Sequence, residues 1–142
     1  MKETKSKWFI AKSEYINSFG KKAVLTQAVY ANNYEEAEKR VISDNQPYCE
    51  GEITIVRLTP APFSIVINAE GQENFYKAKV SYIIYQENKG EKTTRENFLV
   101  AAEDISSALA ILKNYLSKFA DDAQIEALQL SSIQELLNNP EP

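Results

Sequence analysis

An octapeptide near the start of the chain recurs in its second half. Residues 8–15 read WFIAKSEY and residues 75–82 read FYKAKVSY, with aromatic, alanine, lysine and tyrosine positions in the same order. The correspondence continues into the residues that follow each stretch, so the repeated unit is a whole supersecondary element. This repeat constrains the fold more than any other feature, because one such unit offers too little core to be stable alone.

The first copy, residues 1–62, alternates between apolar and polar residues as strands do. Asn33 is a suitable helix N-cap, with Glu36 three residues on as its capping-box partner. The elements expected are two strands, a helix and a third strand, at residues 8–16, 23–30, 34–43 and 52–58. The first copy is therefore expected to be a ββαβ unit.

The second copy, residues 74–132, repeats this order. Asp104 stands where Asn33 stood, as the N-cap of a second helix, and Ile125 matches Ile53 of the earlier third strand. The strands expected here are residues 74–85, 93–101 and 124–130. The helix should bury an apolar stripe formed by Ile105, Ala108, Leu109, Leu112, Leu116 and Phe119.

Two segments fall outside the copies. Residues 63–73 are expected to form an extra apolar strand, from Phe63 to Ile67 and without a counterpart later, followed by a linker. Residues 133–142 are mostly polar towards their end and are expected to form a flexible C-terminal tail.

These elements predict an α+β fold. We expect a tandem duplication of a ββαβ unit with pseudo-two-fold symmetry, in one compact domain overall, with antiparallel-rich sheets and two helices packed on one face. The pattern leaves open whether the copies form one continuous sheet or two separate sheets.

Composition limits the class of protein. The single cysteine, Cys49, cannot form an internal disulfide and suits a reducing compartment. The N-terminal residues are not followed by an apolar run of signal-peptide type, and no apolar stretch approaches the length of a membrane span. We expect a cytoplasmic protein that does not engage a membrane.

The residue content argues against catalysis. The chain has no histidine, which removes the usual general base and the imidazole metal ligand. Its four glycines form no phosphate-binding loop. The acidic groups at residues 35–38 and 121–122 fit solvated positions better than a reactive site. We therefore expect no catalytic residues, no metal site and no cofactor.

Positive charge is concentrated on the repeated hairpins, although the net charge is −4. Residues 1–22 carry six lysines and two glutamates, and residues 75–95 carry five cations and two glutamates. On the first strand of each copy, a large aromatic ring shares its face with lysines. Single-stranded nucleic acid is bound by such surfaces, because bases stack on rings while cations follow the phosphates.

The sequence therefore predicts a non-enzymatic protein that binds single-stranded DNA or RNA. The residues expected at this interface are the rings and cations of the two hairpins: Trp8, Lys12, Lys21, Lys22, Phe75, Lys77, Lys79, Lys89, Lys92 and Arg95. A structural interpretation competes with this one. Rings at strand starts are more often buried in a core or between two copies, and lysines in turns commonly provide solubility and edge protection.

Several segments carry a resemblance to a known family. They are Trp8, Phe9 and Lys12, and residues 34–40, 47–48, 51–54 and 75–79. In these the chain resembles an uncharacterised domain-of-unknown-function family, number 4494, of gut Bacteroidetes and their phages. Members have Trp-Phe in the second copy as well, where this chain has Phe75 and Tyr76. The resemblance implies a bacterial or phage origin and supports the duplication, but it brings no chemistry and no functional residues.

Two alternatives to nucleic-acid binding stay open. One is a protein–protein interaction module or a phage structural or assembly module, acting as a homo-oligomer or with a protein partner. The other is a small-molecule binder with its site in a groove between the two copies.

Overall fold

The computed structural model of the chain describes residues 6–17, 19–68, 74–119 and 122–137. These residues form two compact units. Unit 1 takes its residues from 1–61 and 133–142, and unit 2 takes its residues from 62–132. Parts of the expected first turn, linker, acidic pair and tail, namely Ser18, residues 69–73, Asp121 and residues 138–142, lie outside the described residues.

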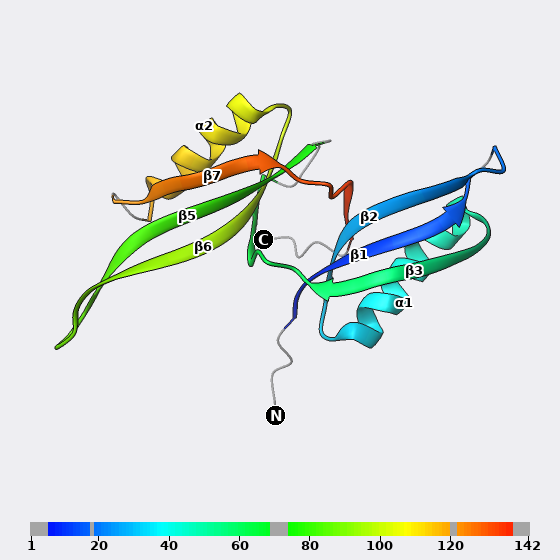
Figure 1. The fold of residues 1–142 in the computed structure, drawn as a ribbon, viewed down its shortest axis with the longest axis horizontal. Helices are drawn as coiled ribbons and strands as arrows, with labels where there is room; N and C mark the ends of the chain where they lie inside the picture. The colour runs from blue at the N-terminus through cyan, green and yellow to red at the C-terminus, as the bar shows by residue number, and fades with distance from the viewer. Residues whose placement is uncertain (1–5, 18, 69–73, 120–121, 138–142) are drawn as a thin grey trace. The chain divides into compact units, whose positions relative to one another are not determined.

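Unit 1 contains a four-stranded sheet, one α-helix and one short 3-10 helix (Figure 1). Its elements are β1 (Lys7–Ile16), β2 (Lys22–Ala31), α1 (Tyr34–Asn45), the short 3-10 helix η1 (Gln46–Tyr48), β3 (Glu50–Pro60) and β8 (Glu135–Leu137). The strand order is β3-β1-β2-β8, and β1 runs antiparallel to both of its neighbours.

Unit 2 contains a second four-stranded sheet with one helix (Figure 1). Its elements are β4 (Ile65–Ile67), β5 (Asn74–Gln86), β6 (Gly90–Ala102), α2 (Ile105–Leu116) and β7 (Gln124–Leu130). The strand order is β4-β6-β5-β7. The α+β class is therefore confirmed, and the strands form two antiparallel-rich sheets rather than one continuous sheet.

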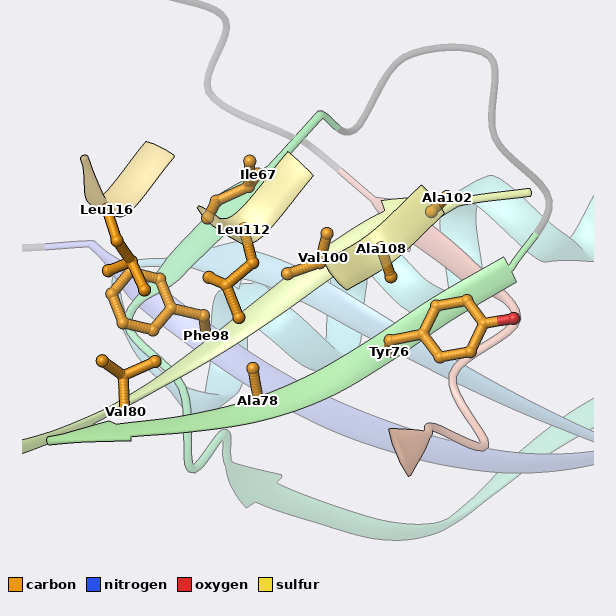
Figure 2. Packing of buried hydrophobic residues seen from close by; sticks show 10 residues of the cluster. All are labelled: Ile67, Tyr76, Ala78, Val80, Phe98, Val100, Ala102, Ala108, Leu112 and Leu116. Carbon is orange, nitrogen blue, oxygen red and sulfur yellow. The ribbon is translucent and has the colours of Figure 1, made fainter. Parts of the chain in front are cut away.

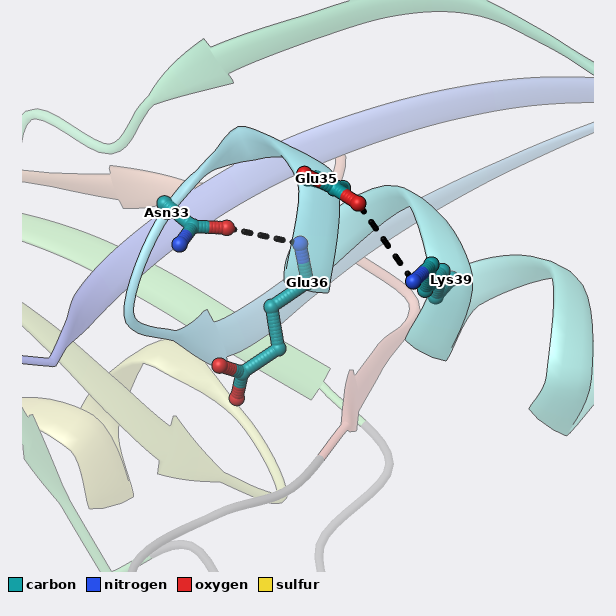
Figure 3. A network of polar contacts seen from close by, with 4 residues as sticks. All are labelled: Asn33, Glu35, Glu36 and Lys39. Carbon is teal, nitrogen blue, oxygen red and sulfur yellow. Dashed lines mark hydrogen bonds and ion pairs between the residues drawn. The ribbon is translucent and has the colours of Figure 1, made fainter.

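Both helices begin where the capping signals predict. Asn33 has an extended backbone, and its side-chain oxygen accepts a hydrogen bond of 2.8 Å from the backbone N–H of Glu36 (Figure 3). Asp104 accepts the equivalent bond from Ser107, also at 2.8 Å, and this bond lowers the pKa of the Asp104 carboxyl. An exposed ion pair between Lys39 and Glu35, 3.4 Å apart, follows one turn into α1 (Figure 3).

The second helix is shorter than its apolar stripe suggested. Helix α2 ends at Leu116, so Phe119 lies beyond the helix and its side chain is 69% exposed rather than buried. Ile105, at the first turn, is also exposed. The buried stripe is limited to the residues that face the sheet, Ala108, Leu112 and Leu116.

Each helix covers one face of its own sheet. In unit 2, alternate residues of β5 and β6 meet one side of α2 in a cluster of Ile67, Tyr76, Ala78, Val80, Phe98, Val100, Ala102, Ala108, Leu112 and Leu116 (Figure 2). In unit 1, the corresponding cluster is Phe9, Ala11, Val29, Ala31, Ala37, Val41 and Leu137. The period of two along the strands therefore selects the core residues, as the alternating pattern predicted.

We call the short strands β4 and β8 the exchanged strands, because each pairs in a different sheet from the strand that precedes it in the chain. β4 follows β3 of unit 1 in the chain, yet it pairs in parallel with β6 of unit 2, with Ile65 opposite Phe98. β8 follows β7 of unit 2, yet it pairs in parallel with β2 of unit 1, with Glu135 opposite Gln27. Two expectations were therefore wrong: the strand around residue 65 has a counterpart, and residues 135–137 form a strand and not a flexible tail.

Buried polar contacts attach β8 to unit 1. The Gln27 and Asn45 side-chain amides exchange two hydrogen bonds, of 3.0 and 2.7 Å, and both residues are buried. The Gln27 amide also donates to the Glu135 carboxylate at 3.0 Å. These bonds join β2 to α1 and to β8, and they satisfy amide groups that would be costly to bury unpaired.

The outer strand β3 contains two register shifts against β1, the first between Lys12 and Ser13, and β7 contains one against β5, between Lys79 and Val80. Beyond the shift, Ser13 lies opposite Ile55 in unit 1, and Val80 lies opposite Ile125 in unit 2. Ile125 therefore corresponds to Ile55 and not to Ile53. The equivalence of Ile53 and Ile125 expected from the sequence was therefore wrong by two residues. Pairing with the central strand sets the register, and a bulge cannot be recognised in an apolar pattern.

Candidate functional site

The two rings expected to stack on nucleic-acid bases are buried. The Trp8 side chain is 5% exposed and packs edge-on against Tyr30, with ring centroids 5.1 Å apart, and Phe75 is 3% exposed. Each ring lies on the sheet face opposite the helix of its unit, as the alternation predicted. The expectation that both rings are presented to solvent is wrong, because large rings contribute most when removed from water.

The predicted cations are exposed, and those of unit 2 are divided between the two faces of its sheet. Lys77, Lys79 and Arg95 share the helix-distal face of unit 2, whereas Lys92 lies opposite Ile84 on the other face and Lys89 in the turn. In unit 1, Lys12 and Lys22 share a face and Lys21 lies in the turn before β2.

Acidic neighbours offset part of this charge. Lys22 pairs with Glu14 at 3.1 Å, and Arg95 pairs with Glu126 at 3.1 Å. Partial burial pushes the pKa of Glu126 upward, but hydrogen bonds from Arg95 and Ser81 outweigh it and lower the pKa below its ordinary value. Three predicted interface lysines lie within the central strands and are exposed: Lys12 in unit 1, and Lys77 and Lys79 in unit 2.

A groove in the surface of unit 2 is a feature that the sequence did not predict. It has a volume of about 770 Å³ and lies between the outer part of the β5–β6 hairpin and the end of α2. We call it the arm groove, and its lining residues are Ile65, Tyr82, Ile83, Ile84, Tyr85, Glu96, Phe98, Tyr115, Leu116, Phe119 and Asp122. Phe98 and Leu116 also belong to the core cluster (Figure 2). The groove therefore opens where that cluster ends.

Apolar side chains are unusually exposed around the arm groove. Tyr85 is 76% exposed and Phe119 is 69% exposed, while Ile83 and Ile84 are each 39% exposed. Single exposed apolar residues are ordinary on protein surfaces, but a group lining one hollow is typical of binding sites.

The outer part of β5 has a strand on one side only. β7 pairs with β5 from Tyr76 to Ser81 and begins at Gln124, so residues 82–86 extend past it (Figure 1). In unit 1, β3 pairs with β1 as far as Ile16. Within the described residues, this part of β5 therefore presents an open sheet edge, which we call the β5 edge.

Carboxylates accept hydrogen bonds from three groups at the arm groove. The Tyr82 hydroxyl donates to Glu96 at 2.7 Å, and this bond raises the pKa of the Tyr82 phenol. A hydrogen bond to Glu91 likewise raises the pKa of Tyr85. The backbone N–H of Ile83, on the β5 edge, donates to the Asp122 carboxylate at 3.2 Å. The polar groups at the groove are therefore mostly acidic acceptors.

Other site types have little support in the described part of the chain. No group of three or more His, Cys, Asp or Glu side chains is placed there to hold a metal ion. Within the described ranges between residues 6 and 137, no helix is long and apolar enough to cross a membrane.

One signal for the arm groove was present in the sequence. Residues 80–86 read VSYIIYQ, a run without charge, proline or glycine on a strand that otherwise alternates with lysines. Such a run favours an intermolecular strand contact when its edge is open. The sequence could not show that the edge is open, because that depends on where β7 begins.

Comparison with known proteins places the chain in a family. No curated protein sequence matches it. The model of the family described as "Domain of unknown function (DUF4494)" matches residues 7–139, which covers both units and confirms the resemblance seen in the sequence. The chain therefore belongs to this family of domains of unknown function.

Proposed function

We propose that the protein is a non-catalytic protein-interaction module, and that the arm groove of unit 2 binds a segment of a partner protein. The observation that carries this proposal is the exposure of Ile83, Ile84, Tyr85 and Phe119 around one hollow. Covering these side chains removes apolar area from water, which is the main driving force of protein association. Tyrosine suits such a surface because its ring is apolar and its hydroxyl reaches water.

The chemistry of the groove also supports a binding role over a catalytic one. The titratable groups of its lining are tyrosines and two carboxylates, Glu96 and Asp122. Both carboxylates accept hydrogen bonds from the protein itself, from the Tyr82 hydroxyl and the Ile83 backbone. One bond therefore joins β5 to β6 within the hairpin, and the other joins the hairpin to the residues before β7.

Nucleic-acid binding is the weaker proposal. It retains the exposed Lys77 and Lys79 of β5, but it loses stacking on Trp8 and Phe75, which are buried. Lysines alone give an electrostatic contact that weakens steeply with salt. The exposed rings of the arm groove do not replace the lost ones, because their polar neighbours, Glu96 and Asp122, would repel phosphates.

A peptide-display experiment tests the interaction proposal. Purified protein is panned against a library of random peptides, and the enriched peptides are measured by fluorescence anisotropy against wild type and the double variant Tyr85→Ser, Phe119→Ser. Both positions are largely exposed, so the variant should fold. We expect its affinity to fall at least about tenfold, because interface aromatic residues commonly contribute more than 1 kcal/mol each.

The matched control removes one phenylalanine and one tyrosine elsewhere. Phe19 and Tyr48, in unit 1, are each 85% exposed and do not line the groove, so Phe19→Ser with Tyr48→Ser provides the same chemical change as a control. This control should bind as wild type does. Equal loss of binding in both double variants, or a library that yields no specific peptide, would overturn the proposal.

We also infer that the chain arose by tandem duplication of a ββαβ unit. In support, the two sheets have matching strand orders, both helices start at side-chain N-caps, and the central strands meet a register shift at the equivalent positions Lys12 and Lys79. The exchanged strands extend the match, because Glu135 and Ile65 occupy the same place in their sheets. The approximate two-fold relation between the copies stays a prediction.

A further inference from the structure

The β5 edge offers backbone groups as well as apolar side chains. Along a strand, backbone N–H and C=O groups point alternately to the two sides. The bond from the Ile83 N–H to Asp122 shows that Ile83 points to the open side, and Tyr85, two residues on, points the same way. An added strand can therefore pair with Ile83 and Tyr85, as peptides do when they extend an exposed sheet edge.

The side chains of this edge select for an apolar strand. Residues 82–86 read YIIYQ and contain no charge, and isoleucine and tyrosine are favoured on pleated surfaces. Successive residues of an added strand point to opposite faces. One set of its side chains would therefore enter the arm groove, next to Ile84, Phe98 and Phe119, and must be apolar.

The charges at the groove select for a basic strand. Asp122 bonds the Ile83 N–H, so its carboxylate lies at the edge itself, whereas Glu96 lies on the groove face and is occupied by the Tyr82 hydroxyl. Of the hairpin cations, Lys92 lies on the groove face opposite Ile84 but outside the groove lining, Lys89 lies in the turn, and Arg95 pairs with Glu126 on the other face. A cationic side chain beside Asp122 would gain a partner, whereas an acidic one would meet like charge.

We propose that the partner segment is an extended peptide that alternates apolar and basic residues and adds as a strand to the β5 edge. This inference rests on the proposed function and specifies its ligand. In the free protein, the Ile83 N–H donates its hydrogen bond to the Asp122 carboxylate. On binding, a backbone carbonyl of the peptide takes that N–H, and a lysine or arginine of the peptide pairs with the released carboxylate.

Three labelled, end-blocked peptides test the ligand class. They are Lys-Val-Arg-Val-Lys-Val-Arg, its acidic analogue with glutamate at every basic position, and its glycine analogue with glycine at every valine. Fluorescence anisotropy at about 150 mM salt, where distant charges are screened, gives the affinities. We expect the basic apolar peptide to bind at least about tenfold more tightly than either analogue, a difference of about 1.4 kcal/mol.

Two protein variants separate a specific charge contact from a general one. Asp122→Asn keeps an oxygen that can accept from Ile83 but removes the charge, and Glu52→Gln makes the same charge change at an exposed position of β3 in unit 1. Asp122→Asn should lower the affinity for the basic peptide about three- to tenfold, and Glu52→Gln should leave this affinity unchanged. Equal effects of the two variants would show general attraction and overturn the inference.

The strand geometry has its own readout. Amide hydrogen exchange followed by NMR should show the Tyr85 N–H becoming protected when the basic peptide binds, and a peptide N-methylated at alternate residues should fail to bind. Binding without protection of Tyr85, or equal binding of basic and acidic peptides, would overturn this inference while leaving a protein-binding groove. Failure of every peptide, from the three above to the display library, would overturn the proposed function as well.

Discussion

Leu137 offers the sharpest test of the exchanged strands. It lies in β8, its side chain is 6% exposed, and it packs into the core of unit 1 with Phe9, Val29 and Val41. If β8 completes unit 1, Leu137→Ala removes a fully packed side chain and leaves a cavity. Substitutions of this kind cost about 2–5 kcal/mol, a large part of a typical stability of about 5–15 kcal/mol.

The assay uses the position of the single tryptophan. Trp8 is the only tryptophan of the chain and is buried in β1, so its fluorescence reports the unfolding of unit 1 in urea. With a slope of about 1.5 kcal/mol per molar urea, a loss of about 3 kcal/mol lowers the midpoint by about 2 M. Leu130→Ala provides the control, because Leu130 is 62% exposed and its truncation should change stability by about 0.5 kcal/mol or less.

A particular result would refute this reasoning. If Leu137→Ala and Leu130→Ala shift the tryptophan-detected midpoint equally, β8 does not contribute to the core of unit 1. Circular dichroism, which reports both units, would then show whether the variant had unfolded a part of the chain remote from Trp8.

The remaining predictions concern buried polarity, pH and nucleic acid. Gln27→Leu should cost about 1–3 kcal/mol in urea unfolding by leaving the Asn45 amide unpaired, and adding Asn45→Leu should recover part of the loss. The hydrogen bond from the Ser107 N–H lowers the pKa of the Asp104 carboxyl in the folded protein. The stabilisation that ionised Asp104 gives the folded state is therefore complete above the unfolded-state pKa of about 4, and it is lost as the pH falls through the lower folded-state pKa. When the pH falls from about 7 to about 3, the melting temperature of Asp104→Asn should therefore decrease less than that of the wild type. A labelled single-stranded oligonucleotide should not bind at about 150 mM salt, and binding at that salt which survives replacement of Lys77 and Lys79 by Gln would contradict the burial argument.

Local signals were enough to predict most of the elements. Asn33 and Asp104 cap their helices through their own side chains, and the alternation along β1 and β5 selects the core residues, so each can be read from a few neighbouring residues. The strand Gln124–Leu130 has the predicted bounds for the same reason. These features are determined by chain geometry within one or two turns.

Non-local choices could not be predicted in the same way. β8 is three residues long, so it carries no measurable period, and its position is fixed by β2 more than a hundred residues earlier, as in the bond from Thr26 to Gln134 with a sequence separation of 108. Trp8 and Phe75 were assigned to the correct faces, but a strand pattern does not show whether a face is covered. The arm groove escaped prediction because it depends on β7 starting at Gln124.

The exchanged strands also determine the order in which the two units can be completed during translation. All of unit 1 except β8 has been made once the ribosome passes Pro60, but the outer edge of β2 then has to wait for Leu137. In that interval all of unit 2 is translated, with its own edge position on β6 already filled by β4. The half that is translated first is therefore completed last, and the nascent chain carries an unfilled sheet edge that a chaperone or a neighbouring nascent chain could occupy.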